Sequence, residues 1–367
     1  MIRVLIPDGE SYFACPVVRC LSRHADVRIH IASRERWVPQ RFSRHCSGFH
    51  RLPSSEDDRA EELVRLARRH HLDVILPVSE EGAQFVARYR DALAPRVRSA
   101  GPHDIHQIER AVDKATAHEL VRELGIPAPR TIRLTHDDAF ETSVRSMRFP
   151  VLVKARRAGG GSHIHRLESR EALKAFLEAH PEIRNDYIIQ QFHRGADLSC
   201  NVLCRDGELL TWAFYEGRSP GVRPFAPPLE VEFLEDDQVL EHLRRLLKAL
   251  SWNGVADVDW IRDAETGEAL FLEINARFWS SLLAARAAGI DFPYLACRAA
   301  LGEEVLPAPY RHIRYLAMGR SVPHVTKRVL SARPAPISIR DLSQHISDPL
   351  PLAVRRFRTW WNQRSRS

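Results

Sequence analysis

The stretch Gly254-Val-Ala-Asp-Val-Asp-Trp-Ile-Arg-Asp-Ala-Glu-Thr-Gly-Glu-Ala-Leu-Phe-Leu-Glu-Ile-Asn-Ala-Arg277 decides the interpretation of the chain. Two apolar runs, 255–261 and 269–274, flank a polar segment rich in turn-forming residues, and this pattern predicts a β-hairpin. Residues two apart face the same side of a strand, so the hairpin would bring three oxygen-bearing side chains together: Asp259, Glu273 and Asn275. Two carboxylates and an amide suit Mg²⁺ that also holds substrate phosphates.

The competing interpretation of this hairpin is an amphipathic ribbon whose acids are simply solvated. The neighbouring residues argue against it, because Leu272, Ile274, Phe278 and Trp279 are apolar. Carboxylates in apolar surroundings are unfavourable unless a cation or a proton satisfies them. Arg277 continues the face of Glu273 and Asn275 with a positive charge.

With this motif the chain resembles the ATP-grasp superfamily, in which an acid and then Glu-x-Asn-x-Arg hold the metals and phosphates of ATP. The resemblance implies that two Mg²⁺ ions, with Mn²⁺ as an alternative, are bound by Asp259, Glu273 and Asn275. It also implies that Arg277 braces the phosphate or an acylphosphate. Asp257, which shares a strand face with Asp259, stands where some relatives have an arginine, so one phosphate cation is unassigned. Two arginines in the loop that follows residue 216 are candidates for it: Arg218 and Arg223.

Two lysines precede the hairpin in motifs of their own. Lysine occurs only five times among 54 basic residues, so a retained lysine points to a need for a compact ammonium group. Lys114 opens a helix predicted within 105–126, and Lys154 ends a strand that runs into a glycine-rich loop. In the superfamily both lysines contact ATP phosphates, and the loop would add backbone N–H donors: Gly159, Gly160, Gly161 and Ser162.

The run Tyr187-Ile-Ile-Gln-Gln-Phe-His-Arg-Gly-Ala-Asp197 resembles the hinge of the superfamily. There an edge backbone contacts adenine, and an acid after the glycine binds the ribose hydroxyls, which assigns Asp197 to ribose. Many relatives have glutamate near the start of this motif. The adenine-side candidates here are Gln190, Gln191 and Phe192.

The first hundred residues alternate strand-like and helix-like segments, which predicts a doubly wound parallel sheet with covering helices. A Gly-x-Gly-x-x-Gly fingerprint does not follow the first strand, so a dehydrogenase is not expected. Ligands bind at the carboxyl ends of such strands. Asp8 and Glu80 follow two of them and are candidate substrate contacts, although loop acids of this kind are often merely solvated.

We therefore expect an α/β and α+β chain: a doubly wound N-terminal pre-ATP-grasp domain followed by a two-lobed ATP-grasp fold. The predicted divisions are a Rossmann-like domain at 1–105, a lid subdomain at 106–190, a C-terminal ATP-grasp subdomain with the metal site at 191–305 and an extension at 306–367. The predicted compartment is the cytoplasm, because no stretch of about 18 uncharged apolar residues occurs and residues 1–7 are followed at once by an acid.

Charge and cysteine content limit the classes of partner. The net charge of +7 comes from basic residues interleaved with acids, so nucleic acid is not an expected partner. The tail 355–366 could touch a lipid interface through arginines and tryptophans, but a docked terminal helix is favoured. The six scattered cysteines lack the spacing of a zinc site and are predicted to be reduced core residues.

The reaction that the resemblance implies begins with attack of a substrate carboxylate on the γ-phosphate of ATP. An amine then displaces phosphate from the acylphosphate, so the chain is predicted to be an ADP-forming carboxylate-amine ligase and a homodimer. Its substrates would be a small carboxylate and a small amine. Two alternatives stay open: a carboxylase-like enzyme that activates bicarbonate, and a non-catalytic ATP-binding module that regulates a partner.

Overall fold

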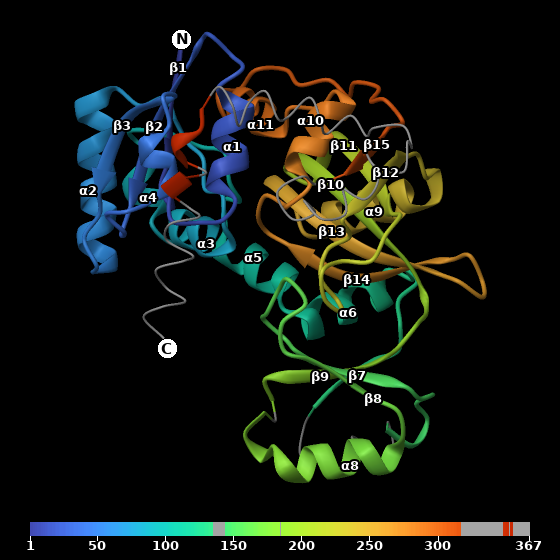
Figure 1. Cartoon of the computed structure of the whole chain (residues 1–367). Helices are drawn as coiled ribbons and strands as arrows, with labels where there is room; N and C mark the ends of the chain where they lie inside the picture. Colours follow the sequence, from blue (N-terminus) through green and yellow to red (C-terminus); the bar gives the residue numbers. More distant parts are fainter. Residues whose placement is uncertain (135–143, 184, 317–347, 352, 355–367) are drawn as a thin grey trace.

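Three β-sheets organise the part of the chain that the structure describes (Figure 1). The structure is a computed structural model and describes residues 1–134, 144–183, 185–316, 348–351 and 353–354. The N-terminal sheet and the largest sheet form the upper part of the molecule in Figure 1, and the third sheet forms a separate lobe below them. Among the described residues, no helix is long and apolar enough to cross a membrane.

The N-terminal sheet is parallel and has the strand order β3-β2-β1-β4-β5. Alternate residues of the central strand face opposite sides: Val4 and Ile6 share a core with α1, whereas Leu5 packs in the core that contains α2 and α3. Helices therefore cover both faces, as the alternating sequence predicts. The elements are β1 (Ile2–Ile6), α1 (Ala14–Leu21), β2 (Val27–Ser33), η1 (Pro39–Phe42), β3 (Cys46–Arg51), α2 (Glu56–His70), β4 (Val74–Ile75), α3 (Glu80–Arg88), α4 (Arg90–Leu93) and β5 (Arg98–Ser99).

A four-stranded antiparallel sheet with the order β6-β9-β7-β8 makes the lower lobe of Figure 1. Helix α8 covers one face through Leu173 and Leu177, which are buried with Val151 and Val153. After the glycine-rich loop the chain returns beside β7 as a strand over 164–167. The elements are β6 (Thr131–Arg133), β7 (Val151–Ala155), β8 (Ile164–Leu167), α8 (Arg170–Ala179), η2 (Pro181–Ile183) and β9 (Tyr187–Gln191).

The largest sheet is antiparallel, has the order β14-β13-β10-β11-β12-β15, and lies between two helical layers. One face shares a core with α10, α11 and α1, and the other packs against α5, α6 and α9. Because α1 belongs to the first of these cores, the N-terminal sheet is joined to this sheet by apolar packing. The elements are α5 (Ile105–Val112), α6 (Lys114–Glu123), β10 (Gly195–Arg205), β11 (Glu208–Gly217), β12 (Glu230–Leu234), α9 (Asp237–Ala249), β13 (Gly254–Asp263), β14 (Ala269–Asn275), α10 (Leu282–Ala288), α11 (Phe292–Ala300) and β15 (Arg314–Leu316).

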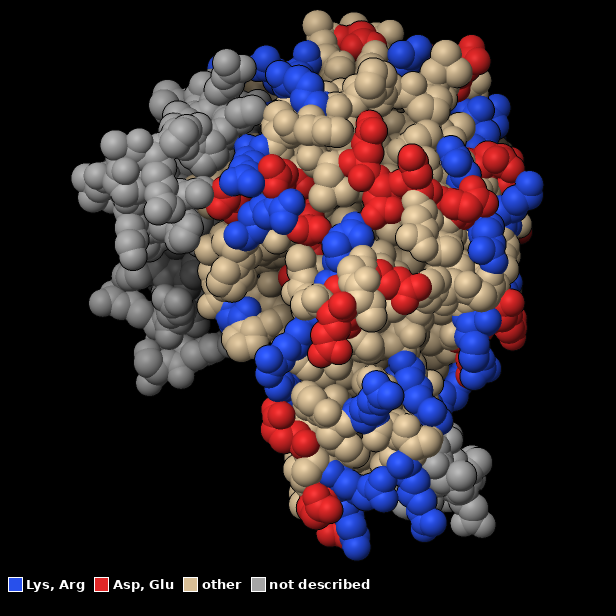
Figure 2. All heavy atoms as spheres, turned by 90° about the vertical axis from the view of Figure 1, so that its right-hand side faces the viewer, with Lys and Arg blue, Asp and Glu red and all other residues tan. Residues whose placement is uncertain are grey.

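The surface carries charges of both signs (Figure 2), and most of the cysteines are buried. On the face shown in Figure 2, basic and acidic side chains are interspersed over the surface. Four of the six cysteines are buried, and Cys200 and Cys204 lie in the same core, as expected for residues four apart on a strand. Cys15 and Cys46 are only half-buried, so they are not full core residues. The predicted tail 355–366 lies outside the described residues.

Three histidines meet at the edge of the N-terminal sheet. His30 Nδ1 lies 3.1 Å from His50 Nε2, and the His70 ring centroid is 4.7 Å from that of His50. Burial, together with the neighbouring His70 and His30, lowers the pKa of His50 from 6.5 to about 4. The unfolded chain therefore binds a proton at His50 at a higher pH than the folded chain does.

This difference predicts that the fold loses stability on mild acidification. Above about pH 6.5 the imidazole is neutral in both states, and the free energy of unfolding is at its full value. As the pH falls from about 6.5 toward about 4, protonation of His50 in the unfolded chain lowers this free energy. We expect the urea midpoint of the His50→Gln variant to depend less on pH between about 7 and 4.5 than that of the wild type. His106→Gln, at an exposed histidine, is the matched control. An unchanged pH dependence in His50→Gln would contradict the assignment.

Candidate active site

The predicted hairpin forms and places its acids opposite one another. In the pairing of β13 with β14, Asp259 lies opposite Glu273 and Asp257 opposite Asn275. Asn275 Nδ2 donates to Asp259 Oδ2 at 3.0 Å, so the amide already contacts one of the carboxylates. The strands thus bring together the three predicted metal ligands, as alternation along a pleated strand requires.

Arg277 lies next to the three predicted metal ligands and contacts one of them, Asn275. Its Nη2 donates to Asn275 Oδ1 at 2.7 Å, its Nη1 donates to the Phe278 carbonyl at 3.0 Å, and its guanidinium stacks 4.8 Å from the ring centroid of Phe13. A β-carbon built on Gly159 would lie 3.6 Å from both Arg277 Nη2 and Asn275 Oδ1. The glycine-rich loop therefore approaches the hairpin directly, and a cation stands at the point of approach.

Both predicted lysines are buried close to the carboxylates of the hairpin. The Asp113 side chain caps α6 by accepting from the backbone N–H of Ala115, which sets Lys114 at the first position of the helix. Lys114 Nζ lies 3.0 Å from Glu273 Oε2 and donates to the Ala158 carbonyl at 2.5 Å. Lys154, at the end of β7, donates to Gln190 Oε1 at 2.6 Å. The ammonium groups thus come from two different elements.

The acids and lysines shift each other's proton affinities. Burial, and the repulsion from Asp257 and Glu273, raises the pKa of Asp259 well above its ordinary value. Burial also opposes ionisation of Glu273, but Lys114 and Lys154 outweigh it and hold the pKa of Glu273 below its usual value. Burial lowers the pKa of Lys154 to about 8. A divalent cation beside Asp259 would supply the positive charge that this carboxylate lacks.

Asp257 is committed to a different set of contacts. Ser199 Oγ donates to its Oδ1 at 2.5 Å and Asn201 Nδ2 donates to the same oxygen at 2.8 Å. This geometry favours Asp259 over Asp257 as the metal ligand on β13. Within the described residues, no three His, Cys, Asp or Glu side chains form a metal cage. The candidate site offers two carboxylates and an amide, a partial set of the kind that suits Mg²⁺ completed by water and phosphate oxygens.

The glycine-rich loop is held by the loop that follows β11. Arg223 Nη1 donates to the Gly161 carbonyl at 2.9 Å, and its Nη2 donates to the Gly160 carbonyl at 2.7 Å. Ser162 Oγ donates back to the Gly159 carbonyl at 2.9 Å, which tightens the turn. Of the two arginines considered for the unassigned cation, Arg223 is therefore the one that reaches this loop.

Arg218 is directed elsewhere. Its Nη1 contacts Glu216 Oε1, and its Nε donates to Glu232 Oε2 at 2.6 Å. With two carboxylates on one guanidinium, its charge is already compensated. The structure does not support Arg218 as a phosphate ligand, because its neighbours on β11 and β12 already use its donors.

The hinge differs from the expectation in two ways. Strand β9 is not an edge strand, because it pairs with β6 on one side and β7 on the other. The N–H groups of Gln191 and Phe192 donate to the carbonyls of Arg130 and Pro150. Gln190 is not available to adenine either: it is 1% exposed, and its amide contacts three side chains, Lys154, His118 and Thr131. Asp197, near the start of β10, is exposed.

The two N-terminal acids have separate roles. Asp8 is buried and accepts from the N–H groups of Val78 and Ser79, which makes it an anchor between the ends of β1 and β4 rather than an open substrate contact. Glu80 begins α3, and its pKa is raised by burial although the charges of Arg277 and Lys114 oppose this effect. Glu80 therefore belongs to the electrostatic surroundings of the candidate site.

Sequence reasoning missed two residues of this site. His118 lies four residues after Lys114 and contacts Gln190, and residues four apart share a helix face, so the spacing carried a signal. Burial lowers its pKa to about 4 and keeps the ring neutral at pH 7. Phe13, whose ring lies against the Arg277 guanidinium, directly precedes α1 of the N-terminal sheet domain. No motif in the sequence links these two residues.

Comparisons with known proteins agree with the resemblance. Residues 184–320 match the family described as ATP-grasp in the biosynthetic pathway with Ter operon. A carbamoyl-phosphate synthase of Methanobrevibacter smithii is 26% identical over 47% of the chain and 48% of its own length. A D-alanine–D-alanine ligase of Carboxydothermus hydrogenoformans is 26% identical over 50% of the chain and 65% of its own length.

Among solved structures, the biotin carboxylase domain of the Hydrogenobacter thermophilus 2-oxoglutarate carboxylase is similar with a TM-score of 0.67 at 19% identity. The superposition covers 85% of this chain and 73% of that one, and that structure was solved with MgADP and bicarbonate. The family match and the curated relatives show that this chain contains an ATP-grasp domain. The matches cover about half to two thirds of the length of those two relatives, and the likeness to the solved structure shows the fold alone.

Proposed function

We propose that this chain is an ATP- and Mg²⁺-dependent carboxylate-amine ligase that releases ADP and phosphate. The observation that carries the proposal is the meeting of Asp259, Glu273 and Asn275 with Lys114 and Arg277 under a glycine-rich loop. Side chains of these types can bind or neutralise phosphate or metal, and none of them is a serine or cysteine nucleophile. Phosphoryl transfer to a carboxylate needs positioning and charge compensation, which these groups supply.

The side chains divide the work in the proposed reaction. Asp259, Glu273 and Asn275 would hold Mg²⁺, which when bound neutralises negative charge on the phosphates. Lys114 and Lys154 would donate to the phosphates, and the loop that begins at Gly159 would cover them. A carboxylate oxygen of the substrate attacks the γ-phosphorus, the bond to the bridging oxygen breaks and ADP leaves.

The second step completes the atom balance. An amine attacks the carbonyl carbon of the acylphosphate, the carbon–oxygen bond to phosphate breaks, and the nitrogen loses a proton. Arg277 would stabilise the negative charge that gathers on the acyl and phosphate oxygens, because its guanidinium is held in place by Asn275 and Phe278. The proposed roles of Glu80 and Arg223 are to orient Arg277 and the loop, respectively.

The test is phosphate release from MgATP across a panel of amino acids and small carboxylates, with and without amines. ADP and phosphate that appear only with one acid and one amine would support the ligase. Release with bicarbonate alone would favour the carboxylase-like alternative, for which the biotin carboxylase fold is the supporting observation. ATP binding with no release under any condition would favour a regulatory module.

The glycine-rich loop provides a prediction that does not need the substrate. Gly161 has φ +70°, and a β-carbon there would lie 2.1 Å from the Phe225 carbonyl oxygen. Gly161→Ala must therefore separate the loop from residues 216–228, and we expect the Kd for MgATP to rise about tenfold. Gly160→Ala is the matched control, because Gly160 has φ +67° with nothing within 4 Å. Equal affinities of the two variants, measured by calorimetry, would count against a role of this contact.

A further inference from the structure

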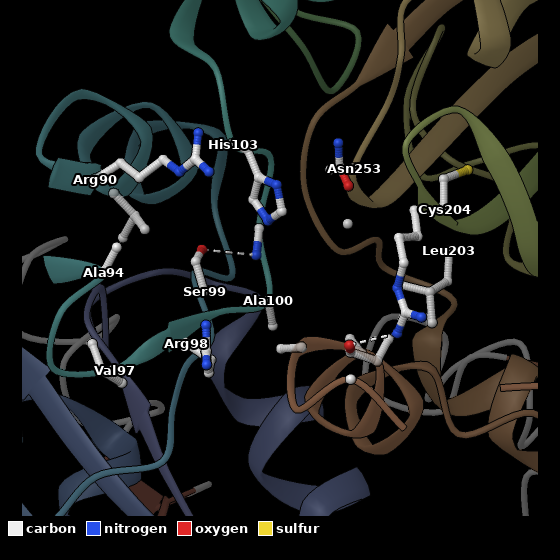
Figure 3. Close-up of a pocket in the computed structure, with 18 of the residues that line it drawn as sticks. Arg90, Ala94, Val97, Arg98, Ser99, Ala100, His103, Leu203, Cys204 and Asn253 are labelled. Atoms are coloured by element: carbon white, nitrogen blue, oxygen red, sulfur yellow. Dashed lines mark hydrogen bonds between the residues drawn. The ribbon is translucent and has the colours of Figure 1, made fainter. Parts of the chain in front are cut away.

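A cavity of about 390 Å³ lies at the opposite end of the largest sheet from the candidate active site (Figure 3). Its walls are α4, β5 and the residues after them on one side, and the ends of β10, β13 and α11 on the other. Cys204 pairs with Gly254 at this end of β10 and β13. Asp259 is five residues further along β13, about 17 Å away at the rise of a strand. None of the candidate active-site residues lines the cavity.

The charges that line this cavity are mostly positive. Three arginines, Arg90, Arg98 and Arg205, face a single acid, Asp206, which accepts from Asn253 Nδ2 at 3.2 Å. His103 also lines the cavity, but burial and the charge of Arg90 lower its pKa, so its ring is neutral at pH 7. Arg205 is engaged, since its Nη2 donates to the carbonyls of Ala299 at 2.6 Å and Glu303 at 3.2 Å.

Among the residues that line the cavity, Arg90 and Arg98 are both exposed, and no other described residue uses their guanidinium donors. Within the described residues neither guanidinium forms an ion pair or a side-chain hydrogen bond, and both belong to the same wall, from α4 and β5. Figure 3 shows Arg90 beside His103, with Arg98 below them. Two unpaired guanidinium groups at one cavity favour an anion, because their planar donors match the oxygens of carboxylate and phosphate.

Apart from Ser99 and Asn253, the rest of the lining consists of apolar or small residues and leaves room. Leu93 and Val97 lie on the wall of the arginines, and three small residues of α11 lie opposite: Ala296, Ala299 and Ala300. A volume of about 390 Å³ falls in the range of small-molecule sites. Apolar walls with a few convergent polar groups select a ligand with both an apolar body and a charged end.

We propose that this cavity binds a small organic anion, whose carboxylate or phosphate group is held by Arg90 and Arg98 and whose apolar body packs against the alanines of α11. The ligand would bridge the N-terminal sheet and the largest sheet. This site is separate from the ATP-grasp site and does not depend on the reaction proposed for it.

The test is calorimetric titration of the full chain with phenyl phosphate, phenylacetate and neutral benzyl alcohol. Magnesium and a non-hydrolysable ATP analogue are present at saturation in every titration, so that the nucleotide site is filled. We expect at least one of the anions to bind at least about tenfold more tightly than the alcohol, and the tighter anion identifies the group that the arginines hold. In the double variant Arg90→Gln/Arg98→Gln the Kd for that anion should rise about tenfold or more.

Two further variants make the result specific. Arg96→Gln, at an exposed arginine outside the cavity lining, should bind the anion as the wild type does. Ala299→Leu fills the cavity from the opposite wall without changing charge and should abolish binding. The proposal is overturned if neither anion binds up to about 10 mM, or if the double variant or Ala299→Leu retains wild-type affinity while folded by circular dichroism.

Discussion

Turnover of the Glu273→Gln variant is expected to fall by about two orders of magnitude or more while the fold is retained. Glutamine keeps the shape of the side chain and an oxygen that can accept from Lys114, but it removes the charge needed by a divalent cation. The carboxylate of Glu273 also compensates the buried charges of Lys114 and Lys154, which hold its pKa low. The urea midpoint is therefore expected to fall somewhat below the wild-type value, while the variant stays folded at the assay temperature.

Two measurements separate this result from a general effect of substitution. Phosphate release and the urea midpoint are compared with those of Glu265→Gln, which changes an exposed acid in the turn of the same hairpin. That control should match the wild type in both. Wild-type phosphate release from Glu273→Gln, with the substrates found in the panel, would remove Glu273 from the proposed site.

The second large effect is expected for Lys154→Ala, which should lower kcat/KM by about two orders of magnitude. Lys154 is buried on β7, and this burial disfavours the charged ammonium and lowers its pKa to about 8. The lysine is charged below that pH and neutral above it. In the wild type kcat/KM should be highest below about pH 8 and fall as the pH rises through this value.

The pH profile tests the role of the charge rather than of the side-chain volume. The fall near pH 8 should disappear in Lys154→Ala, whereas Lys154→Arg should retain a charge through the whole range. Lys174→Ala, at an exposed lysine on α8 of the same lobe, is the matched control and should keep the wild-type profile. If Lys154→Ala keeps a wild-type kcat/KM and profile, Lys154 does not act on the phosphates.

The sequence was most informative where period and turn chemistry agree. The hairpin of β13 and β14 follows from two apolar runs around a polar turn, and the start of α6 follows from Asp113 before Lys114. The strand that ends at Lys154 and the glycine-rich loop after it follow equally clearly from the sequence. In each case the local pattern alone determines the element, and tertiary packing against the rest of the chain does not change it.

Elements that depend on tertiary context were not predicted. Strand β3 contains Gly48 and His50 and has little apolar character, and it forms because it extends a sheet that already exists. The interior position of β9 depends on β6, which lies more than fifty residues earlier in the chain. No local pattern reports on such pairings, and for this reason the sequence of the hinge predicts an edge strand.

The roles of individual polar side chains depended on geometry as well. Arg218 and Arg223 belong to one loop, and the sequence alone does not show which of them lies near the proposed phosphate site. The structure separates them, because Arg218 meets Glu232 whereas Arg223 reaches Gly160. Asp8 shows the same effect: its position after a strand suggested a ligand contact, but the backbone of Val78 uses its carboxylate. The divisions at 105, 190 and 305 stay a prediction.

The measurement that tests the central claim most directly follows an oxygen atom. The acid identified by the panel is labelled with oxygen-18 in its carboxylate, and the phosphate released with MgATP and the amine is analysed by phosphorus NMR. Attack of the carboxylate on the γ-phosphorus predicts phosphate with one labelled oxygen per turnover and unlabelled ADP. Label in AMP, or phosphate without label while the amide forms, would contradict an acylphosphate and with it the proposed function.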